Sequence, residues 1–243
     1  MCMPPKRINV KEYQLFPEDK FELSLNHYND LNVNSRIIKR IFEMTNTCAP
    51  PVDMCKIYYC LKGENKHDIR ISKKHDLNVF LQYFPFVLDS VIKQSNHGIQ
   101  RNRPRVVFVC NSTEEALKVH SMVEQFVKGF NVRVVLSRDD RKMKFNTDNM
   151  KVPYTILVTT LHNLQHHLEH PLVYFSDCSH FIMVNLSSWK EENNYSILAS
   201  LMITSGWDPK NKCSVIGISE MFGYASRDIF NYFSYKNYYD IGF

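Results

Sequence analysis

Five short runs of apolar, largely β-branched residues divide the second half of the chain and constrain its fold more than any other feature. They are RVVFVC (105–110), NVRVVLS (131–137), YTILVTT (154–160), HFIMVNL (180–186) and CSVIGIS (213–219). Such near-continuous apolar runs are typical of parallel strands that are buried on both faces.

Segments with helical spacing of apolar residues separate these runs, at 112–130, 161–170 and 195–206. The first has Ser112 or Thr113 as a helix cap and acidic residues in its first turn. Strands and helices therefore alternate, which predicts an α/β fold with a doubly wound, mostly parallel sheet flanked by helices.

The first half of the chain continues the same alternation. The expected elements are a helix at 34–44, a helix at 53–63, a short strand at 67–72 and a helix at 76–94 that is kinked or restarted near Pro85. Residues 1–27 contain proline, lysine and short polar pieces, so we expect them to form an N-terminal extension.

Composition narrows the class of protein. The 243 residues are enough for one large domain, and the net charge of +5 is compatible with a nucleic-acid partner without requiring one. The seven cysteines are scattered and lack CxxC spacing, and no secretory signal is present, which favours a reduced, intracellular location. No run of 18 apolar residues occurs, so we expect no membrane span.

Glycine is scarce, with 7 residues in 243. Loops that cradle phosphates are built from glycine, because the backbone must approach the phosphate closely. Where such a loop would lie, between the strand at 67–72 and the helix after it, the sequence is SKKHDLN (72–78), without glycine or a GK[ST] pattern. We therefore expect an ordinary solvated turn there.

The end of the fourth run raises a related question, because strand ends in nucleotide-handling domains usually carry carboxylates. Here the residues are Asn185, Leu186, Ser187 and Ser188. An amide cannot supply the charge that magnesium needs, and serines cannot act as general bases. This pattern indicates a polar turn.

Two other features have a functional and a simpler interpretation. His162, His166 and His170 share one helix face and could bind zinc, although exposed histidines are the favoured interpretation. The aromatic segment 222–243, which includes Arg227 and Lys236, could stack nucleobases, but packing on its own domain is favoured.

The order of these elements resembles the first RecA-like domain of DEAD-box RNA helicases over residues 28–225. Residues 28–53 resemble the Q-motif region, with Tyr28 at its aromatic position and Asp53 in place of the glutamine that reads adenine. SKKHDLNV takes the place of the phosphate loop, with Asn78 or Val79 at the lysine.

The remaining motifs follow in the family's order. VVFVCNSTEEALKV resembles the APTRELA segment, with Ser112, Glu114 and Ala116 matching and Thr113 replacing the arginine. ILVTTLHNL is similar to the ATPGRL segment, keeping Thr160 but with Asn163 for arginine. Asn185–Ser188 replace all four letters of DEAD on the VLDEAD strand, and VIGISEMF keeps only Ser219 of the SAT segment.

The resemblance implies a helicase fold without helicase chemistry. ATP and magnesium, the cofactors of the family, are expected to be lost, and no metal site is expected. The implied function is a catalytically inactive module that binds single-stranded RNA or protein partners. A pure protein scaffold and an ATP-dependent helicase with divergent motifs are the alternatives. The residues implied in RNA binding are Arg101, Arg103, Arg105, Ser112, Thr113, Glu114, Thr160 and Asn163.

The resemblance also suggests a setting for the domain. Residues 226–243 are expected to form an aromatic tail or linker, and a second RecA-like domain is expected in the parent chain. Degenerate helicase domains of this kind occur in Tudor-domain proteins of the piRNA pathway, such as the Yb group. That origin implies an RNA-silencing ribonucleoprotein assembly in the cytoplasm, including its granules.

Overall fold

The computed structural model describes residues 27–47, 49–62, 67–94, 101–137, 150, 152–189 and 195–242. These residues form one seven-stranded sheet in the order β3-β4-β2-β5-β6-β1-β7, in which every neighbouring pair is parallel. The strands are β1 (Asp68–Ser72), β2 (Val106–Cys110), β3 (Val134–Ser137), β4 (Ile156–Thr160), β5 (His180–Met183), β6 (Ser214–Ser219) and β7 (Tyr238–Ile241). The predicted fold class is confirmed.

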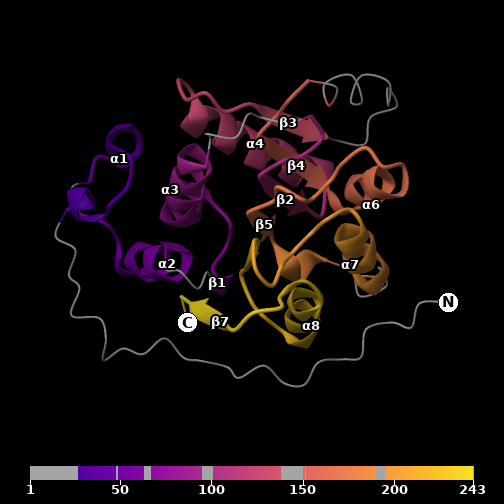
Figure 1. The fold of residues 1–243 in the computed structure, drawn as a ribbon. Coiled ribbons are helices and arrows are strands. Elements are labelled where there is room, and N and C mark those ends of the chain that lie inside the picture. The colour runs from indigo at the N-terminus through magenta and orange to yellow at the C-terminus, as the bar shows by residue number, and fades with distance from the viewer. Residues whose placement is uncertain are drawn as a thin grey trace.

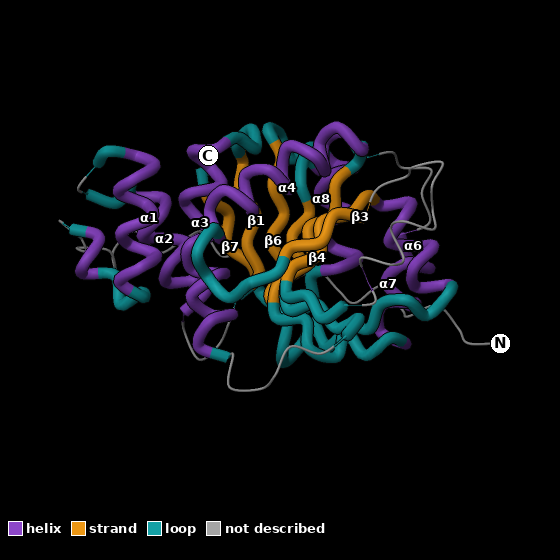
Figure 2. Tube along the Cα trace, turned by 90° about the horizontal axis from the view of Figure 1, so that it is seen from above, coloured by secondary structure: helices purple, strands orange, loops and turns teal. Residues whose placement is uncertain are grey.

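Helices cover both faces of the sheet (Figure 1). The helices on one face are α1 (Ser35–Thr45), α2 (Val52–Lys62), α3 (Leu77–Lys93) and α4 (Thr113–Val127), and those on the other are α6 (Leu161–Glu169), α7 (Tyr195–Thr204) and α8 (Tyr224–Phe233). Two 3-10 turns, η2 (Tyr28–Asp30) and η3 (Leu186–Ser188), complete the described elements. Viewed from above, the strands lie side by side between these two layers (Figure 2).

The core is divided by the sheet because successive strand residues point to opposite faces. Val106 and Phe108 of β2 belong to the cluster under α1–α4, whereas Val107 and Val109 belong to the cluster under α6–α8. Each continuous apolar run therefore contributes side chains to the core on both faces of the sheet. No helix in the described ranges is long and apolar enough to cross a membrane.

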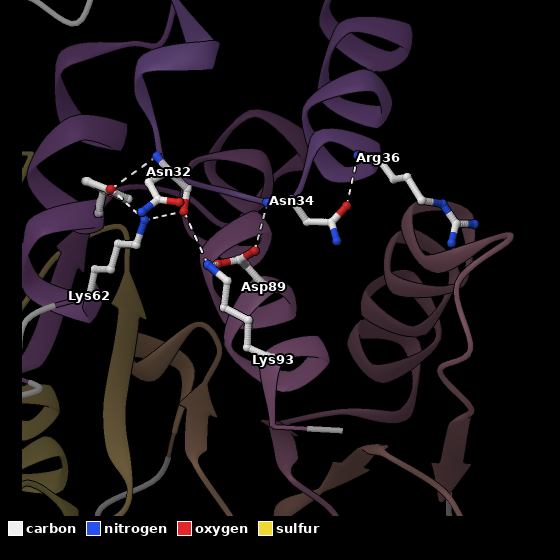
Figure 3. A network of polar contacts seen from close by, with 7 residues as sticks. Asn32, Asn34, Arg36, Lys62, Asp89 and Lys93 are labelled. Carbon is white, nitrogen blue, oxygen red and sulfur yellow. Dashed lines mark hydrogen bonds and ion pairs between the residues drawn. The ribbon is translucent and has the colours of Figure 1, made fainter. Parts of the chain in front are cut away.

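A polar network attaches the N-terminal segment to this framework (Figure 3). The backbone amide of Asn34 donates to the Asp89 carboxylate at 2.9 Å, and the Lys93 ammonium donates to the same group at 2.6 Å. The carbonyl oxygen of Asn32 accepts from the ammonium groups of Lys62 and Lys93. Residues 1–26 of the expected extension lie outside the described residues.

Some predicted elements differ from the observed ones. The fourth apolar run, expected as a strand over 180–186, ends as β5 at Met183 and turns into η3. The turn is made at Asn185, whose φ of 57° lies in the left-handed region that asparagine tolerates. The helix expected to kink or restart near Pro85 is one unbroken element, α3, in which Pro85 itself is buried.

The segment expected as an aromatic tail or linker, 226–243, contains most of α8 and the edge strand β7. β7 pairs with β1, with Arg70 opposite Asp240. Those two side chains form a buried ion pair. The guanidinium of Arg70 also lies over the Tyr238 ring, 4.4 Å from its centroid. Charged residues therefore hold the last strand in the sheet.

Candidate functional site at the carboxyl edge of the sheet

The segments that follow the strands meet at one edge, because every strand of a parallel sheet points the same way. We call this the carboxyl edge. It brings together the predicted positions after β1 (Asn78, Val79), β2 (Ser112–Glu114), β4 (Thr160, Asn163), β5 (Asn185–Ser188) and β6 (Ser219). The residues that the family resemblance singled out at these positions therefore lie along one edge of the sheet.

The turn after β1, in the place of a phosphate loop, is occupied by its own side chains. Lys73 forms an ion pair with Asp53 at the start of α2. Asp76 caps α3 by accepting from the Val79 amide at 2.9 Å. His75 Nε2 lies 2.9 Å from the Tyr83 hydroxyl, and burial lowers the pKa of His75 to about 4.

The two positions that the family resemblance assigned to the missing lysine are not equivalent. Asn78 is exposed in the first turn of α3, and Val79 is buried in the core. Of the two lysines in this turn, Lys74 is exposed, and Lys73, which sequence reasoning did not single out, forms the ion pair. Its signal was the pair of lysines in SKKHDLN, but its partner Asp53 is 20 residues away and could not be inferred.

Tyr28, which matches the aromatic position of the family's Q-motif region, is buried beside α1. Its ring meets Phe42 edge-on with centroids 5.4 Å apart, and its hydroxyl lies 3.3 Å from Thr47 Oγ1. The ring is 2% exposed, so it is part of the core.

The turn after β5 contains a leucine that points into the core. Leu186 is 0% exposed and belongs to the cluster under α7 and α8. A Cβ atom placed on Gly217 would lie 2.9 Å from Leu186 Cδ1 and 2.5 Å from Phe230 Cδ2, so these two side chains close over the glycine. Ser187 and Ser188 are exposed, and the Ser187 amide donates to Ser219 Oγ at 3.0 Å.

A carboxylate that sequence reasoning missed lies beside this turn. Glu115 accepts a hydrogen bond from the Asn111 amide at 3.0 Å and another from the Asn185 side chain. Desolvation is the larger effect and raises the pKa of Glu115 above its ordinary value. The Asn111 amide nitrogen Nδ2 donates to the Ser188 carbonyl at 2.8 Å, which ties the loops after β2 and β5 together.

Two helix N-termini open onto the same edge. Ser112 caps α4 by accepting from the Glu115 amide at 3.2 Å, and in the first turn Glu114 is exposed whereas Thr113 is half-buried. Thr160 caps α6 by accepting from the Asn163 amide at 3.3 Å. The Asn163 side chain is 7% exposed, and its Nδ2 has no hydrogen-bond partner among the described residues.

The three predicted arginines lie at the opposite edge of the sheet. Arg101, Arg103 and Arg105 precede β2, whereas Ser112 follows it, and a five-residue strand spans roughly 17 Å. Arg105 is 9% exposed, and its Nη1 donates to the Val91 carbonyl at 3.2 Å. The fold therefore does not join these arginines to the helix N-termini in one site.

The histidines of α6 and its C-cap differ in how deeply they are buried. His162 is exposed, and the rings of His166 and His170 lie edge-on with centroids 4.4 Å apart. His167 points inward instead, with its Nε2 2.6 Å from Ser137 Oγ. Within the described residues, no group of three or more His, Cys, Asp or Glu side chains is placed to hold a metal ion.

Comparison with known proteins supports the architecture. No protein-family model matches the sequence, and no curated protein matches it. Among solved structures, the yeast DEAD-box splicing factor Prp28 superposes with a TM-score of 0.72 at 13% identity, over 91% of this chain and 52% of that one.

Two further structures agree. The DEAD-box helicase Mss116, solved with single-stranded RNA and UDP-BeF, gives a TM-score of 0.70 at 16% identity, covering 90% of this chain and 45% of that one. The helicase MrfA, solved with DNA and AMPPNP, gives 0.68 at 13% identity, covering 97% and 31%. The fold is therefore that of a helicase RecA-like domain, and its neighbours include DEAD-box helicases. The chain spans about half, or less, of the length of these neighbours.

Proposed function

We propose that this chain is a helicase-like domain that binds single-stranded RNA at its carboxyl edge and does not hydrolyse ATP. The observation that carries the proposal is Leu186, which is sealed in the core at the strand end where the family resemblance expects an acid. A carboxylate cannot replace that side chain without being buried among Phe230 and Gly217.

The turn after β1 supports the same conclusion. A phosphate loop needs an available ammonium group and a backbone that can approach the phosphate closely. Here the Lys73 ammonium is paired with Asp53, and the turn contains no glycine. The residues present therefore do not fit the phosphates and magnesium of ATP, and no catalytic step is assigned to this domain.

RNA binding is supported by the two helix N-termini. Backbone amides at a helix N-terminus, together with the helix dipole, attract phosphate. The start of α4 is exposed at Ser112, and the start of α6, which Thr160 caps, is exposed at His162. Mss116 and Dbp5, both similar in fold, have been solved with RNA.

The test is a titration of labelled single-stranded RNA at 50 and 200 mM salt. Two or three phosphate contacts should give micromolar affinity that falls about tenfold between these salt concentrations. Thr113→Glu should weaken binding because it adds charge beside the phosphates, yet it suits the helix dipole and should not harm folding. Ser121→Glu adds the same charge at an exposed position of α4 about two turns from its N-terminus and serves as the matched control.

A parallel titration with labelled ATP and magnesium distinguishes the divergent-helicase alternative. We expect no saturable binding at micromolar concentrations, because the Lys73 ammonium is paired with Asp53 and the turn after β1 has no glycine. Saturable ATP binding would overturn the proposal that the ATP site is lost. RNA that stays unbound at 50 mM salt would overturn the proposal that the domain binds RNA.

A pure protein scaffold is the second candidate, and the outer face of α7 favours it. The helix carries no charged residue, and Ile197 and Ile203 are 49% and 46% exposed. Dbp5 has been solved with the proteins Gle1 and Nup159, which illustrates such contacts in a neighbour. A partner that stays bound after nuclease treatment and is lost on Ile197→Asp would support this function.

The wider setting is also a proposal. We place the domain in an RNA-silencing assembly of the cytoplasm, in a Tudor-domain protein related to the Yb group, with a second RecA-like domain in the parent chain. The support is the resemblance of the degenerate motifs together with the neighbours' greater length. Identifying the RNAs and proteins that co-purify with the parent protein tests this setting.

A further inference from the structure

The segment after β6 exposes two large side chains that the proposed function leaves unexplained. Met221 is 75% exposed and Tyr224 is 92% exposed. Among the described rings of the aromatic segment 222–243, Phe222, Phe230, Phe233 and Tyr238 are buried in the core. Tyr224 is therefore the most exposed of these described rings and the one most accessible to a nucleobase.

The exposed side chains stand on a rigid support. The Met221 carbonyl accepts from Ser219 Oγ at 2.7 Å, and the Gly223 carbonyl accepts from Ser226 Oγ and from the Arg227 amide, each at 3.1 Å. Between them Phe222 is anchored, with the Arg70 guanidinium 5.2 Å from its ring centroid. A side chain held on a fixed backbone loses less conformational entropy when a ligand binds.

The position of this segment continues the proposed RNA path. The strands β4, β2, β5 and β6 are consecutive in the sheet, so the loops after them form a row along the carboxyl edge. Three strand spacings of about 4.8 Å put the segment roughly 14 Å from the start of α6. The bond from the Ser187 amide to Ser219 Oγ connects it to the turn after β5. A few nucleotides of one strand can span that distance.

The chemistry of the segment suits a nucleobase better than a phosphate. A Cβ on Gly223 would meet nothing within 4 Å, so the approach to the neighbouring ring is open. Arg227 is exposed three residues along the helix from Tyr224, on the same side. The exposed carboxylates of Glu220 and Asp228 oppose its charge, so attraction of phosphate is weak and stacking dominates.

We propose that Met221 and Tyr224 form a stacking platform for one unpaired base of the RNA strand bound along the carboxyl edge. This inference rests on the proposed function and extends it from phosphate contacts to a base contact. The platform accepts any base, because every base presents a π-face.

The experiment compares RNA affinity of the wild-type chain with that of Tyr224→Ala, Tyr224→Phe and Tyr232→Ala, using the same labelled oligonucleotides at 50 and 200 mM salt. Tyr224→Ala should weaken binding roughly tenfold, and Tyr224→Phe should stay within about twofold because it keeps the ring. Tyr232, on the same helix and 42% exposed, is the matched control and should be silent. The ratio of wild-type to Tyr224→Ala affinity should not change with salt, since stacking is not ionic.

The outcomes separate the two proposals. If Thr113→Glu weakens binding but Tyr224→Ala does not, the platform is overturned and the proposed function stands. If Tyr224→Ala abolishes capture of a protein partner without affecting RNA, the exposed ring serves a protein and the platform is likewise overturned. If the wild-type chain does not bind RNA at all, both proposals fail.

A covalent readout is independent of affinity. Irradiation of RNA containing 5-iodouridine should attach the base to the peptide that contains residues 221–224, because a stacked aromatic ring lies against the halogenated base. Cross-links confined to other peptides would contradict the platform even if the affinities followed the expected order.

Discussion

At the scale of single residues, Leu186 shows how a turn of the backbone at the end of β5 buries a side chain where a catalytic acid would have to face outward. Asn185 adopts a left-handed conformation, and the next side chain is then buried under α8. The two serines that follow remain outside, where the Ser187 amide donates to Ser219 Oγ and the Ser188 hydroxyl donates to the Asn185 carbonyl. A site that would need outward-facing acids has become part of the packing between β6 and α8.

Leu186→Glu should destabilise the chain by roughly 3 kcal/mol or more, because it buries a carboxyl group without a partner and removes apolar contacts. Ser188→Asp, at an exposed position of the same turn, should change stability by less than about 0.5 kcal/mol. Urea unfolding monitored by circular dichroism measures both. Equal stabilities of the two variants would show that Leu186 is not sealed in the core.

At the scale of elements, β7 depends on charged residues of β1. The Asp68 carboxylate accepts from the Val215 amide at 2.8 Å and from Ser234 Oγ at 2.8 Å, which holds the segment leading into β7. Arg70 then pairs with Asp240 inside β7 itself. Both side chains of that pair are at most 2% exposed, so the pair is fully desolvated.

Arg70→Met should cost about 3–5 kcal/mol of stability, because it leaves the Asp240 carboxylate buried and unpaired. The double variant Arg70→Met/Asp240→Leu should recover much of that loss, since an apolar pair of similar volume has no charge to desolvate. Lys118→Met, which breaks the exposed pair with Glu114, is the control and should cost less than about 1 kcal/mol. A double variant as unstable as the single one would contradict this account.

At the scale of the whole molecule, buried histidines make folding sensitive to acid. Burial lowers the pKa of His75 to about 4, and burial together with the neighbouring His166 lowers the pKa of His167 to about 4. Both imidazoles are neutral in the folded chain, whereas the unfolded chain protonates them near pH 6.5. Their contribution is present above pH 6.5 and is lost as the pH falls toward 4.

The free energy of unfolding should therefore decrease between pH 6.5 and 4, by an amount on the order of 3 kcal/mol for each buried histidine. Asp68 acts in the opposite sense, because desolvation raises its pKa and its protonated form is favoured by folding at low pH. His167→Gln should flatten the profile and His162→Gln, at an exposed position, should not. A urea midpoint that is constant from pH 7 to 4.5 would contradict the prediction.

Much of the architecture was predictable because it depends on local patterns. Runs such as RVVFVC and YTILVTT are apolar on both faces, so a buried parallel strand is their natural state. The strand β7, in contrast, has the sequence YYDI and reads as a polar aromatic tail. Its burial depends on Arg70, which lies 170 residues earlier, and no local pattern contains that information.

The candidate site was predictable in part for the same reason. Parallel strands bring their ends to one edge, so the positions of Ser112, Thr160 and Ser219 on that edge follow from the strand assignments alone. Glu115 and Lys73 were missed because their roles depend on partners across the fold, Asn185 and Asp53. Arg105 was grouped with the helix N-termini although it precedes the apolar residues of the second strand, and the same strand assignment puts it at the opposite end from Ser112.

The sequence by itself determined that this chain folds as a parallel α/β sheet and that it lacks a glycine-rich phosphate loop and acids at the fourth run. Periodicity and residue type are sufficient for both, since each depends on neighbours within a few residues. Only the tertiary structure decided that Leu186 points inward, that the aromatic segment closes the sheet through β7, and that Tyr224 remains open to solvent. Those outcomes depend on which distant side chains meet, and burial is a property of the assembled fold.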